Sequence, residues 1–549
     1  MKKRDFLKTS AALASTTLIP SSLLASFAGS KTRLRTVHIG IGGMGAADLA
    51  SISSHKAVDV VALCDVDSKA LTQASKIHPD AKTYKDYRLM FKDMSLDFDA
   101  VIVSTPDHTH APASIMAMQM NKPVYCQKPL THFVSEAREM KKLAEQKNLV
   151  TQMGIQVHSF YDYKLATVLI QSGIIAMANP GEYILMPRNV HISVIKACAL
   201  QNIIPIFFDI EFSRVTGHYM PITKKWFTNV FNNIDFDNSK IAGVILVSPY
   251  YQGYATDLEP LIKICHLHNL PVLVDEAHGS YFLFCENFNL PKSALRSKAD
   301  LVVHSLHKSL NGLTQTAVIW HNGNLIEENR LIKSINLLQT TSPNSLLLSS
   351  CEESIKDWLN KDNLNKYKKR ILEAKSIYNE LIKKKIPLIE TQDPLKIVLN
   401  TSKVGIDGFT ADRFFYKNGL IAELPEMMTL TFCLGFSNQK DFTFLFQKLW
   451  KKLLIHTNKS YGLKAIKPPF RIVQSPEIPI GVAWKSKTIS IPLVESLGKI
   501  SGDIICPYPP GIPLIVPGER IDQERIDWIE AQSLYNEDLL NSYIRVLNN

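Results

Sequence analysis

The chain has 549 residues, of which 46% are hydrophobic and 21% are charged, a composition typical of a globular protein with three or four domains. The net charge of +11 is modest, and lysine clusters such as residues 365–376 have the spacing of solvated helix faces, which disfavours nucleic-acid binding. The eight cysteines are scattered without a C-x-x-C pair, so we expect free thiols.

Residues 1–30 have the architecture of an export signal, with a basic start, an apolar middle and a cleavage-like site at Ser26-Phe27-Ala28. The stretch Lys3–Lys8 resembles a twin-arginine motif in which lysine replaces the first arginine. The segment is too short to span a membrane. We expect a periplasmic protein if the signal is used, and a cytoplasmic one if this is only a disordered basic tail.

The first folded elements have the pattern of a dinucleotide-binding unit. A short strand at Thr36–Ile39 leads into Gly40, Gly42 and Gly45, and a helix follows. The second strand ends at Asp65, 20 residues after Gly45. Glycines let the backbone approach a pyrophosphate at the helix N-terminus, and the acid accepts hydrogen bonds from a ribose diol. The spacing therefore predicts a Rossmann domain that prefers NAD to NADP.

The motifs "CDVD", "STPDHTH", "QKPLTH" and "TQMGIQVHS" give residues 34–175 a specific resemblance to the glucose–fructose oxidoreductase/inositol dehydrogenase/MocA family, particularly its exported branch. The resemblance places Lys128 near the nicotinamide as a candidate catalytic residue, with Gln127 where the family has glutamate. His108, in the loop after the strand Ala100–Ser104, is a further candidate for binding NAD.

This resemblance ends before the family's second domain, which carries the Asp and His that move a proton during hydride transfer. Nothing similar follows the stretch "YDYKLATVLIQSGII". We therefore expect NAD binding without a complete site for oxidising or reducing a sugar.

From about Met177 the chain alternates apolar strands with helices, which predicts a mostly parallel sheet buried on both faces. Asp275 ends one of these strands, Lys308 follows another, and His191 comes directly after "MPRN". A pyridoxal-phosphate site needs a lysine for the Schiff base, an acid at the pyridine nitrogen and an aromatic face over the ring. These three residues supply those groups.

The motifs "PRNVH", "DEAHGSYF", "HSLHKSLNGLTQ", "QTTSP" and "PYPPGIPLIVPGE" make residues 178–549 resemble the Orn/Lys/Arg decarboxylases, pyridoxal enzymes of the aspartate-aminotransferase fold. The resemblance implies a homodimer and no metal. By this resemblance, Lys308 attaches the cofactor covalently and Asp275 pairs with its pyridine nitrogen, while His191 and Ala277 contact the two faces of the ring. Ser305, His307 and Thr341 of a neighbouring subunit would bind the phosphate. Glu519 is the weakest assignment, as the residue that binds the substrate's distal cation.

The join between the two parts lacks the small-residue loop with which the decarboxylase family grips the cofactor phosphate. The helix before "NPGE" has the sequence of the oxidoreductase side, so the chain resembles a fusion of two truncated enzymes. The expected divisions are a signal-like segment 1–30, the Rossmann domain 31–150, a junction helix 151–176, a large pyridoxal-phosphate domain 177–345, a small domain 346–456 and a C-terminal α+β domain 457–549.

Three functions remain open at this point. The favoured hypothesis is decarboxylation of arginine, lysine or ornithine, impaired by the truncations. The second is an NAD-dependent sugar or inositol oxidoreductase whose second half is a scaffold. The third is a non-catalytic protein that keeps only the two ligand-binding parts.

Overall fold

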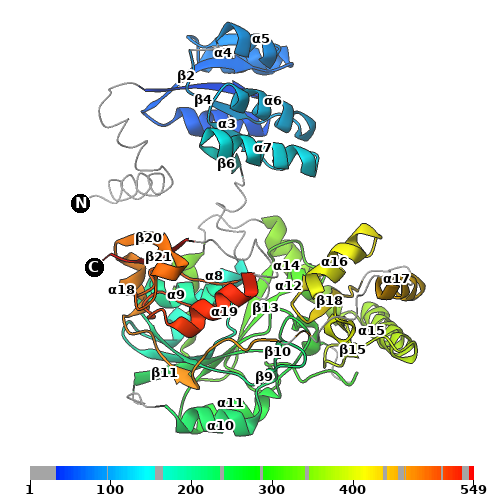
Figure 1. Ribbon diagram of the computed structural model, residues 1–549. Coiled ribbons are helices and arrows are strands. Elements are labelled where there is room, and N and C mark those ends of the chain that lie inside the picture. Colours follow the sequence, from blue (N-terminus) through cyan, green and yellow to red (C-terminus); the bar gives the residue numbers. More distant parts are fainter. Residues whose placement is uncertain are drawn as a thin grey trace. The chain divides into compact units, whose positions relative to one another are not determined.

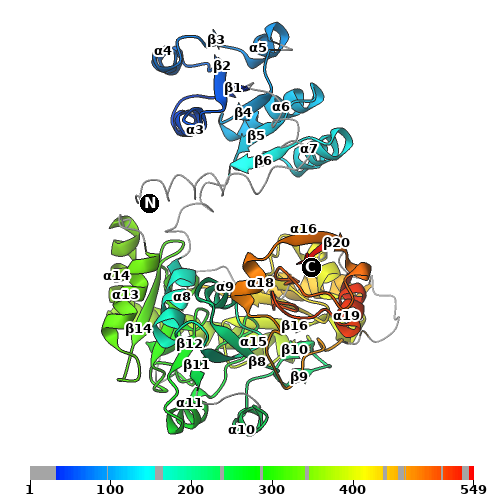
Figure 2. The ribbon, with the colours of Figure 1, turned by 90° about the vertical axis from the view of Figure 1, so that its left-hand side faces the viewer.

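The structure is a computed structural model that divides into two compact units, Met1–Ser159 and Phe160–Asn549. We describe each unit by itself (Figures 1 and 2). The signal-like segment, Thr341 and the join at 155–164 lie outside the described residues. The described ranges are 33–94, 97–154, 165–234, 240–284, 288–339, 345–436, 442–455, 463, 465–507, 511–533 and 543–548.

The first unit is a parallel sheet covered by helices on both faces. Its elements are β1 (Leu34–Ile39), α3 (Met44–Ser53), β2 (Val58–Cys64), α4 (Ser68–Ile77), β3 (Lys82–Tyr84), α5 (Tyr87–Asp93), β4 (Ala100–Val103), α6 (Asp107–Gln119), β5 (Val124–Gln127), α7 (Val134–Lys147) and β6 (Thr151–Gly154). The strand order β3-β2-β1-β4-β5-β6 is that of a Rossmann fold, as predicted.

Alternation along the strands explains the two covered faces. In β2, Ala62 and Cys64 pack in the core cluster with α5, α6 and α7, whereas Leu63 packs with residues of α3 and α4. Successive side chains of a strand point to opposite faces, so a strand that is apolar at every position requires a cover on both sides.

The second unit is built on a larger, mostly parallel sheet. Its elements up to residue 338 are α8 (Leu165–Met177), β7 (Tyr183–Pro187), α9 (Ile192–Gln201), β8 (Ile204–Phe208), β9 (Phe212–Ser213), β10 (His218–Tyr219), α10 (Lys224–Asn232), β11 (Ile241–Val247), α11 (Leu258–Leu267), β12 (Val272–Asp275), η4 (Ser280–Leu283), β13 (Leu301–Ser305), α12 (Leu306–Ser309), β14 (Ala317–His321) and α13 (Glu328–Leu338).

The sheet has the order β14-β13-β12-β11-β7-β8, and a short strand from the C-terminal part, β19 (Val473–Gln474), completes it beside β8. The two edge strands β14 and β19 are antiparallel, and all inner pairs are parallel. Leu273 of β12 packs in the core under α8, α9 and α13, whereas Val272 and Val274 pack in the core under α10 and α11. The predicted burial of both faces is confirmed.

Helix α8 is an integral part of this second unit. It packs against α9, α13 and the strands β12 to β14. Gly173 makes this close approach possible, because a Cβ at this position would lie 2.4 Å from Leu273 Cδ1. The helix therefore fits the core of the large sheet, whatever the origin of its sequence.

The remainder of the second unit forms two smaller layers. They contain α14 (Ser345–Leu359), α15 (Lys361–Lys383), β15 (Leu388–Ile389), β16 (Lys396–Asn400), η5 (Thr401–Val404), α16 (Gly408–Lys417), β17 (Leu424–Pro425), β18 (Thr429–Cys433) and α17 (Thr443–Ile455), then α18 (Ile480–Lys485), β20 (Thr488–Pro492), η6 (Leu493–Glu495), α19 (Gln523–Ser533) and β21 (Tyr543–Leu547). The sheets β15-β16-β18-β17 and β20-β21 are antiparallel.

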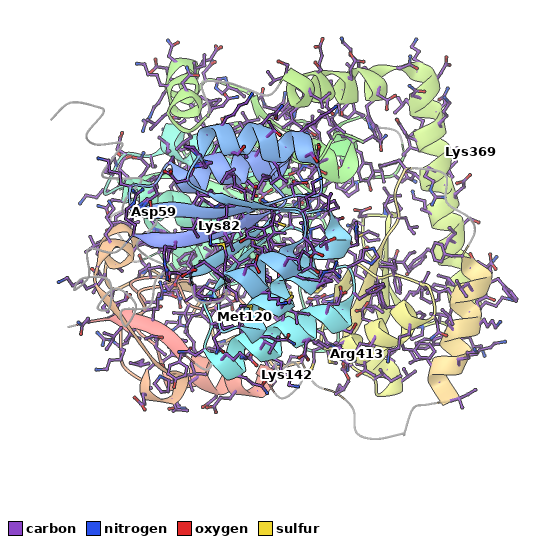
Figure 3. The ribbon with its side chains drawn as sticks, turned by 90° about the horizontal axis from the view of Figure 1, so that it is seen from above. Asp59, Lys82, Met120, Lys142, Lys369 and Arg413 are labelled. Carbon is purple, nitrogen blue, oxygen red and sulfur yellow. The ribbon has the colours of Figure 1, made fainter. Side chains whose placement is uncertain are left out.

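Helix α15 carries the main lysine cluster, and Lys369 points outward from it (Figure 3). This is the solvated helix face that the spacing predicts. In the described part of the chain, the seven cysteines are all free. No helix among the described residues is long and apolar enough to cross a membrane.

Candidate functional sites: a glycine loop and an enclosed cavity

The glycine loop between β1 and α3 is packed too closely for side chains at two positions. A Cβ at Gly45 would lie 2.1 Å from the carbonyl oxygen of Gly40, and one at Gly40 would lie 2.6 Å from that of Ser104. Gly42 is different, because its nearest neighbours would be 3.8–3.9 Å away and include Asp65 Oδ2. A Cβ at Gly42 would make only ordinary van der Waals contacts, so this position is less crowded within the protein than Gly40 and Gly45.

Asp65 is held against this loop. Its Oδ2 accepts a hydrogen bond from the Ile41 backbone N–H at 2.8 Å, and its Oδ1 accepts one from the Asp67 N–H at 2.9 Å. A carboxylate has about four acceptor positions, so two remain for a ribose diol. The residues of this loop therefore fit NAD.

His108 and Lys128 are both exposed, in segments that follow β4 and β5 at the carboxyl edge of the sheet. The neighbouring Gln127 is buried, and its Nε2 donates to Asp48 Oδ2 at 2.8 Å. The Ser104 hydroxyl donates to the same oxygen at 2.6 Å. A glutamate at position 127 would place a second carboxylate against Asp48, which accounts for glutamine at this position.

The second unit contains a cavity of about 470 Å³. It is lined by the start of α8, the carboxyl ends of β11, β12 and β13, and residues of the small and C-terminal parts. Six residues that the sequence assigns to the cofactor line this one cavity: His191, Asp275, Ala277, Ser305, His307 and Lys308.

Strand alternation explains why Asp275 and Ser305 share a face. Leu273 and Val303 belong to the core under α8 and α9. Asp275 and Ser305 come two residues later at the strand ends, so they continue the same series. Carboxyl ends of neighbouring parallel strands meet at one sheet edge, where α/β folds bind ligands.

Lys308 lies on α12, directly after β13, and its Nζ is 3.2 Å from His278 Nε2. Lys308 itself is exposed to the cavity, but the surrounding walls limit its hydration and lower its pKa, and the Asp275 carboxylate opposes that shift. Burial and the nearby Lys308 charge hold the pKa of His278 well below its ordinary value. His278 is therefore a neutral imidazole at pH 7 that can orient the lysine nitrogen.

His191 is the N-cap of α9, and its Nδ1 lies 2.9 Å from Ser193 Oγ. Burial lowers the pKa of His191, and the Asp275 charge opposes the shift. Asp275 itself is fixed by the Ala277 N–H, which donates to its Oδ1 at 3.1 Å. A neutral imidazole and a fixed carboxylate are what the ring face and the pyridine nitrogen of pyridoxal phosphate need.

The side of the cavity expected to hold the phosphate contains polar atoms that have no hydrogen-bond partner among the described residues. Ser305 Oγ and Gln315 Oε1 are buried and lack a hydrogen-bond partner among the described residues. His307 directs its Nδ1 to the carbonyl oxygen of Thr316 at 3.0 Å, which fixes its ring. Thr167, near the start of α8, lines the same cavity. The cavity therefore offers hydroxyl groups to a phosphate, and its residues fit the cofactor.

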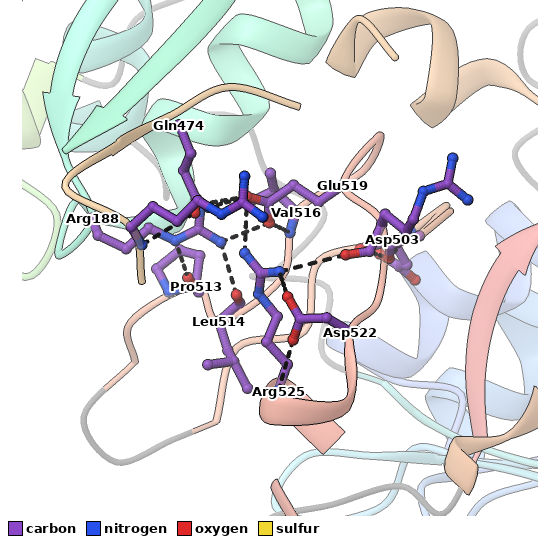
Figure 4. Close-up of polar contacts among 12 residues, drawn as sticks. Arg188, Gln474, Asp503, Pro513, Leu514, Val516, Glu519, Asp522 and Arg525 are labelled. Atoms are coloured by element: carbon purple, nitrogen blue, oxygen red, sulfur yellow. Dashed lines mark hydrogen bonds and ion pairs between the residues drawn. The ribbon is translucent and has the colours of Figure 1, made fainter. Parts of the chain in front are cut away.

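Glu519 lies elsewhere, in a closed ion-pair network (Figure 4). Its two oxygens accept from Arg188 at 2.8 and 2.7 Å, from Gln474 at 2.6 Å and from the Val516 N–H at 2.9 Å. Burial alone would raise the pKa of Glu519, but Arg188 and Arg525 hold it below its ordinary value. The carboxylate is saturated and does not line the cavity, so the structure gives it a different partner from the predicted substrate cation.

Several cavity residues escaped the sequence reasoning, among them His278, Thr167, Gln315 and Glu426. His278 has a visible signal, because it stands three residues after Asp275 in "DEAH", and Gln315 ends the motif "HSLHKSLNGLTQ". Thr167 and Glu426 have no such local signal, because tertiary packing brings them to the cavity. Thr341 lies outside the described residues.

The fold and the two sites thus define a two-part α/β protein. The first part is a dinucleotide-binding fold, and the second is a unit built on a large sheet, with a cavity that contains a lysine. Comparisons with known families agree. Residues 34–155 match the model described as "Oxidoreductase family, NAD-binding Rossmann fold". Residues 145–397 and 464–539 match the major and C-terminal domains of the Orn/Lys/Arg decarboxylases.

Relatives of this chain fall into the same two groups. An arginine decarboxylase of Bacillus anthracis is 29% identical over 395 residues, covering 68% of this chain and 77% of the relative. An inositol 2-dehydrogenase of Salmonella typhimurium is 33% identical over 139 residues, covering 25% of this chain. The chain spans only 40% of the length of that dehydrogenase.

Solved structures support the fold of the larger part. A lysine decarboxylase of Francisella novicida aligns over 94% of this chain and 99% of its own, with a TM-score of 0.58 and 14% identity. Lysine decarboxylase A of Pseudomonas aeruginosa aligns over 94% of this chain and 100% of its own, with a TM-score of 0.56 and 13% identity.

The matches also correct the position of the join. The oxidoreductase match ends at residue 155, and the decarboxylase match has begun by residue 145. Helix α8 therefore belongs to the decarboxylase part, although its motifs resemble the oxidoreductase side as far as about residue 175. Its packing under the large sheet gives the physical reason.

Proposed function

We propose that residues 178–549 decarboxylate a basic amino acid, arginine, lysine or ornithine, with pyridoxal phosphate as cofactor. One observation carries the proposal: Lys308, Asp275 and His191 line a single cavity. The similarity to arginine decarboxylases supports the choice of reaction.

Each residue has a defined task in this proposal. Bound, the cofactor supplies an electron sink for the electron pair left on the α-carbon when carbon dioxide departs. Asp275 holds the proton of the pyridine nitrogen, and His191 fixes the ring plane. Lys308 attaches the cofactor, and its lowered pKa raises the fraction of neutral amine at Nζ that this attachment requires. His278 holds Nζ in position.

In this proposal, the rate of decarboxylation depends on how tightly the protein binds the phosphate group of the cofactor. Catalysis depends on orientation, and about 1 Å of misplacement costs roughly 100-fold. Ser305 and His307 are phosphate residues that the resemblance already assigns, and Thr167 is the hydroxyl that this chain offers in place of the family's small-residue loop. We expect them to hold the phosphate less tightly, which leaves turnover below the ordinary range of about 1–1000 per second.

The test is release of labelled carbon dioxide from arginine, lysine and ornithine at saturating pyridoxal phosphate. Slow but measurable release from one of the three supports the proposal, and an absorbance change on adding cofactor should accompany it. Absence of both signals would leave a protein that does not use this cofactor.

We also propose that the first unit binds NAD(H) through Gly40, Gly42, Gly45 and Asp65. The Rossmann strand order, the close packing at Gly40 and Gly45, and the free acceptor positions of Asp65 support this. Titration followed by nicotinamide fluorescence tests it. We expect no sugar oxidation, since the chain covers 40% of the inositol dehydrogenases.

Two further properties are part of the proposal. A homodimer is expected because the resemblance assigns Thr341 to the cofactor phosphate of a neighbouring subunit, and light scattering of the purified protein measures this. Export is expected if residues 1–30 serve as a signal, and the N-terminal sequence of the mature protein shows whether the segment is removed.

A further inference from the structure

The cavity contains a second carboxylate that the cofactor does not use. Among the described residues that line it, the carboxylates are Asp275 and Glu426, and the lysine is Lys308. Asp275 is committed to the cofactor ring. Glu426 comes from the β17–β18 hairpin of the small domain, far from the Asp275 strand in sequence. The assignments to the cofactor give this second carboxylate no role.

The backbone of Glu426 is fixed on three sides. Its N–H donates to the Thr429 carbonyl at 2.9 Å, and its own carbonyl accepts from the Thr429 N–H at 3.3 Å and from the Gly408 N–H at 3.0 Å. Gly408 is required for this contact, because a Cβ there would lie 2.1 Å from the Glu426 oxygen. The position of the carboxylate is therefore set before any ligand arrives.

The side chain of Glu426 is oriented by Gln252 and His218. Gln252 Nε2 lies 2.9 Å from both carboxylate oxygens, and His218 Nε2 lies 3.2 Å from one of them. His218 Nε2 is also 2.8 Å from Thr429 Oγ1, and its Nδ1 faces the Tyr254 hydroxyl at 3.3 Å. These contacts hold the His218 ring in place between Glu426, Thr429 and Tyr254.

Glu426 is thus a fixed, partly buried carboxylate whose ion-pair neighbour is His218, and among the described residues no lysine or arginine forms an ion pair with it. Burying a carboxylate is costly unless a cation pairs with it. The same cavity is lined by Phe212, Phe409 and Met427, apolar side chains that suit a methylene chain. A ligand with a flexible apolar stem and a cationic tip matches this lining.

We infer that Glu426 is the subsite for the distal cation of the substrate, with Gln252 and His218 as positioning residues. The inference rests on the proposed function and assigns to Glu426 the role that the sequence gives to Glu519. If Glu426 has this role, the second unit should bind amino acids with a cationic tip more tightly than neutral analogues of the same length.

The test uses the full chain loaded with pyridoxal phosphate and compares two probes by titration calorimetry, 1,5-diaminopentane and pentylamine. They differ only in the distal ammonium group. We expect the wild type to bind the diamine about 10- to 100-fold more tightly, the range typical of a hydrogen bond to a charged group. In Glu426→Gln this ratio should fall close to one. Glu426→Asp should restore part of it.

The control is Glu211→Gln, which removes one negative charge from an exposed side chain that does not line the cavity. It should keep the wild-type ratio. A merely structural role for Glu426 would weaken both amines equally and leave the ratio unchanged, which would overturn the inference. A wild-type ratio of one would overturn it as well. If no amino acid is decarboxylated, the proposed function fails while the two-amine ratio still tests the subsite.

Discussion

The two units place candidate binding residues at the same position in their folds, yet surround them differently. In both, these residues follow the carboxyl ends of parallel strands. In the first unit, His108 and Lys128 are exposed. In the second, Lys308 is exposed as well, but α8, the small domain and the C-terminal part line a cavity around the strand ends, and these walls limit hydration and lower the pKa of Lys308 and His278. The fold fixes where ligands bind, and the surrounding walls shift the pKa of the groups that lie there.

The largest expected effect concerns the lysine of the enclosed site. Lys308→Ala should lower carbon dioxide release by about 1000-fold or more, because it removes covalent attachment and a positioned proton carrier. NAD binding by the first unit should not change. Lys333→Ala, an exposed lysine of α13, is the control. Equal loss in both variants would show that Lys308 has no special role.

The second prediction separates the buried Glu519 from the cavity. Glu519→Gln leaves Arg188 with its charge unpaired, and the free energy of unfolding of the second unit should fall by about 3–5 kcal/mol. All six tryptophans lie in this unit, so urea unfolding followed by tryptophan fluorescence reports on it alone. Glu477→Gln, whose pair with Arg520 is half exposed, should cost at most about 1 kcal/mol. Equal effects would contradict a buried structural role.

The same pair predicts a dependence of stability on pH. The pKa of Glu519 in the folded protein lies below the ordinary value of 4.5, so its contribution is present above that value. It is lost as the pH falls through the folded-state pKa. As the pH is lowered below about 4.5, the urea concentration at the unfolding midpoint should therefore decrease more for the wild type than for Glu519→Gln. Parallel curves would refute the assignment.

The third prediction concerns the open site. Asp65→Ala should weaken NADH binding by about 10- to 100-fold, because one or two hydrogen bonds to a charged group are lost. Asp80→Ala, an exposed acid of the same unit, should leave the affinity unchanged. Fluorescence titration of NADH measures both. If Asp65→Ala binds as the parent does, the ribose assignment fails.

The smallest effect is expected for a hydroxyl in the cavity. Ser305→Ala should weaken pyridoxal-phosphate binding by about 10-fold, because the variant loses one donor to the phosphate. Absorbance titration with the cofactor gives the affinity. Ser193→Ala is a demanding control, since it removes only the Ser193 contact to the His191 ring and should have a smaller effect on affinity.

The sequence predicts the strand-loop-helix units well, because strict apolar runs and glycine spacing are local signals. The expected strand ends at Ile39, Asp275 and the residues before Lys308 agree with β1, β12 and β13. Glu426 and Glu519 show the limit. Both are acids in loops, and only tertiary packing decides that Arg188 saturates Glu519 while Glu426 faces the cavity.

The most direct test of the account is where pyridoxal phosphate attaches to this chain. The full protein is incubated with the cofactor, reduced with borohydride and digested, and the labelled peptide is identified by mass spectrometry. The account predicts a single adduct at Lys308, because among the described lysines this one combines a lowered pKa with a cavity that contains Asp275 and His191. A label spread over exposed lysines such as Lys369, with none at Lys308, would contradict it.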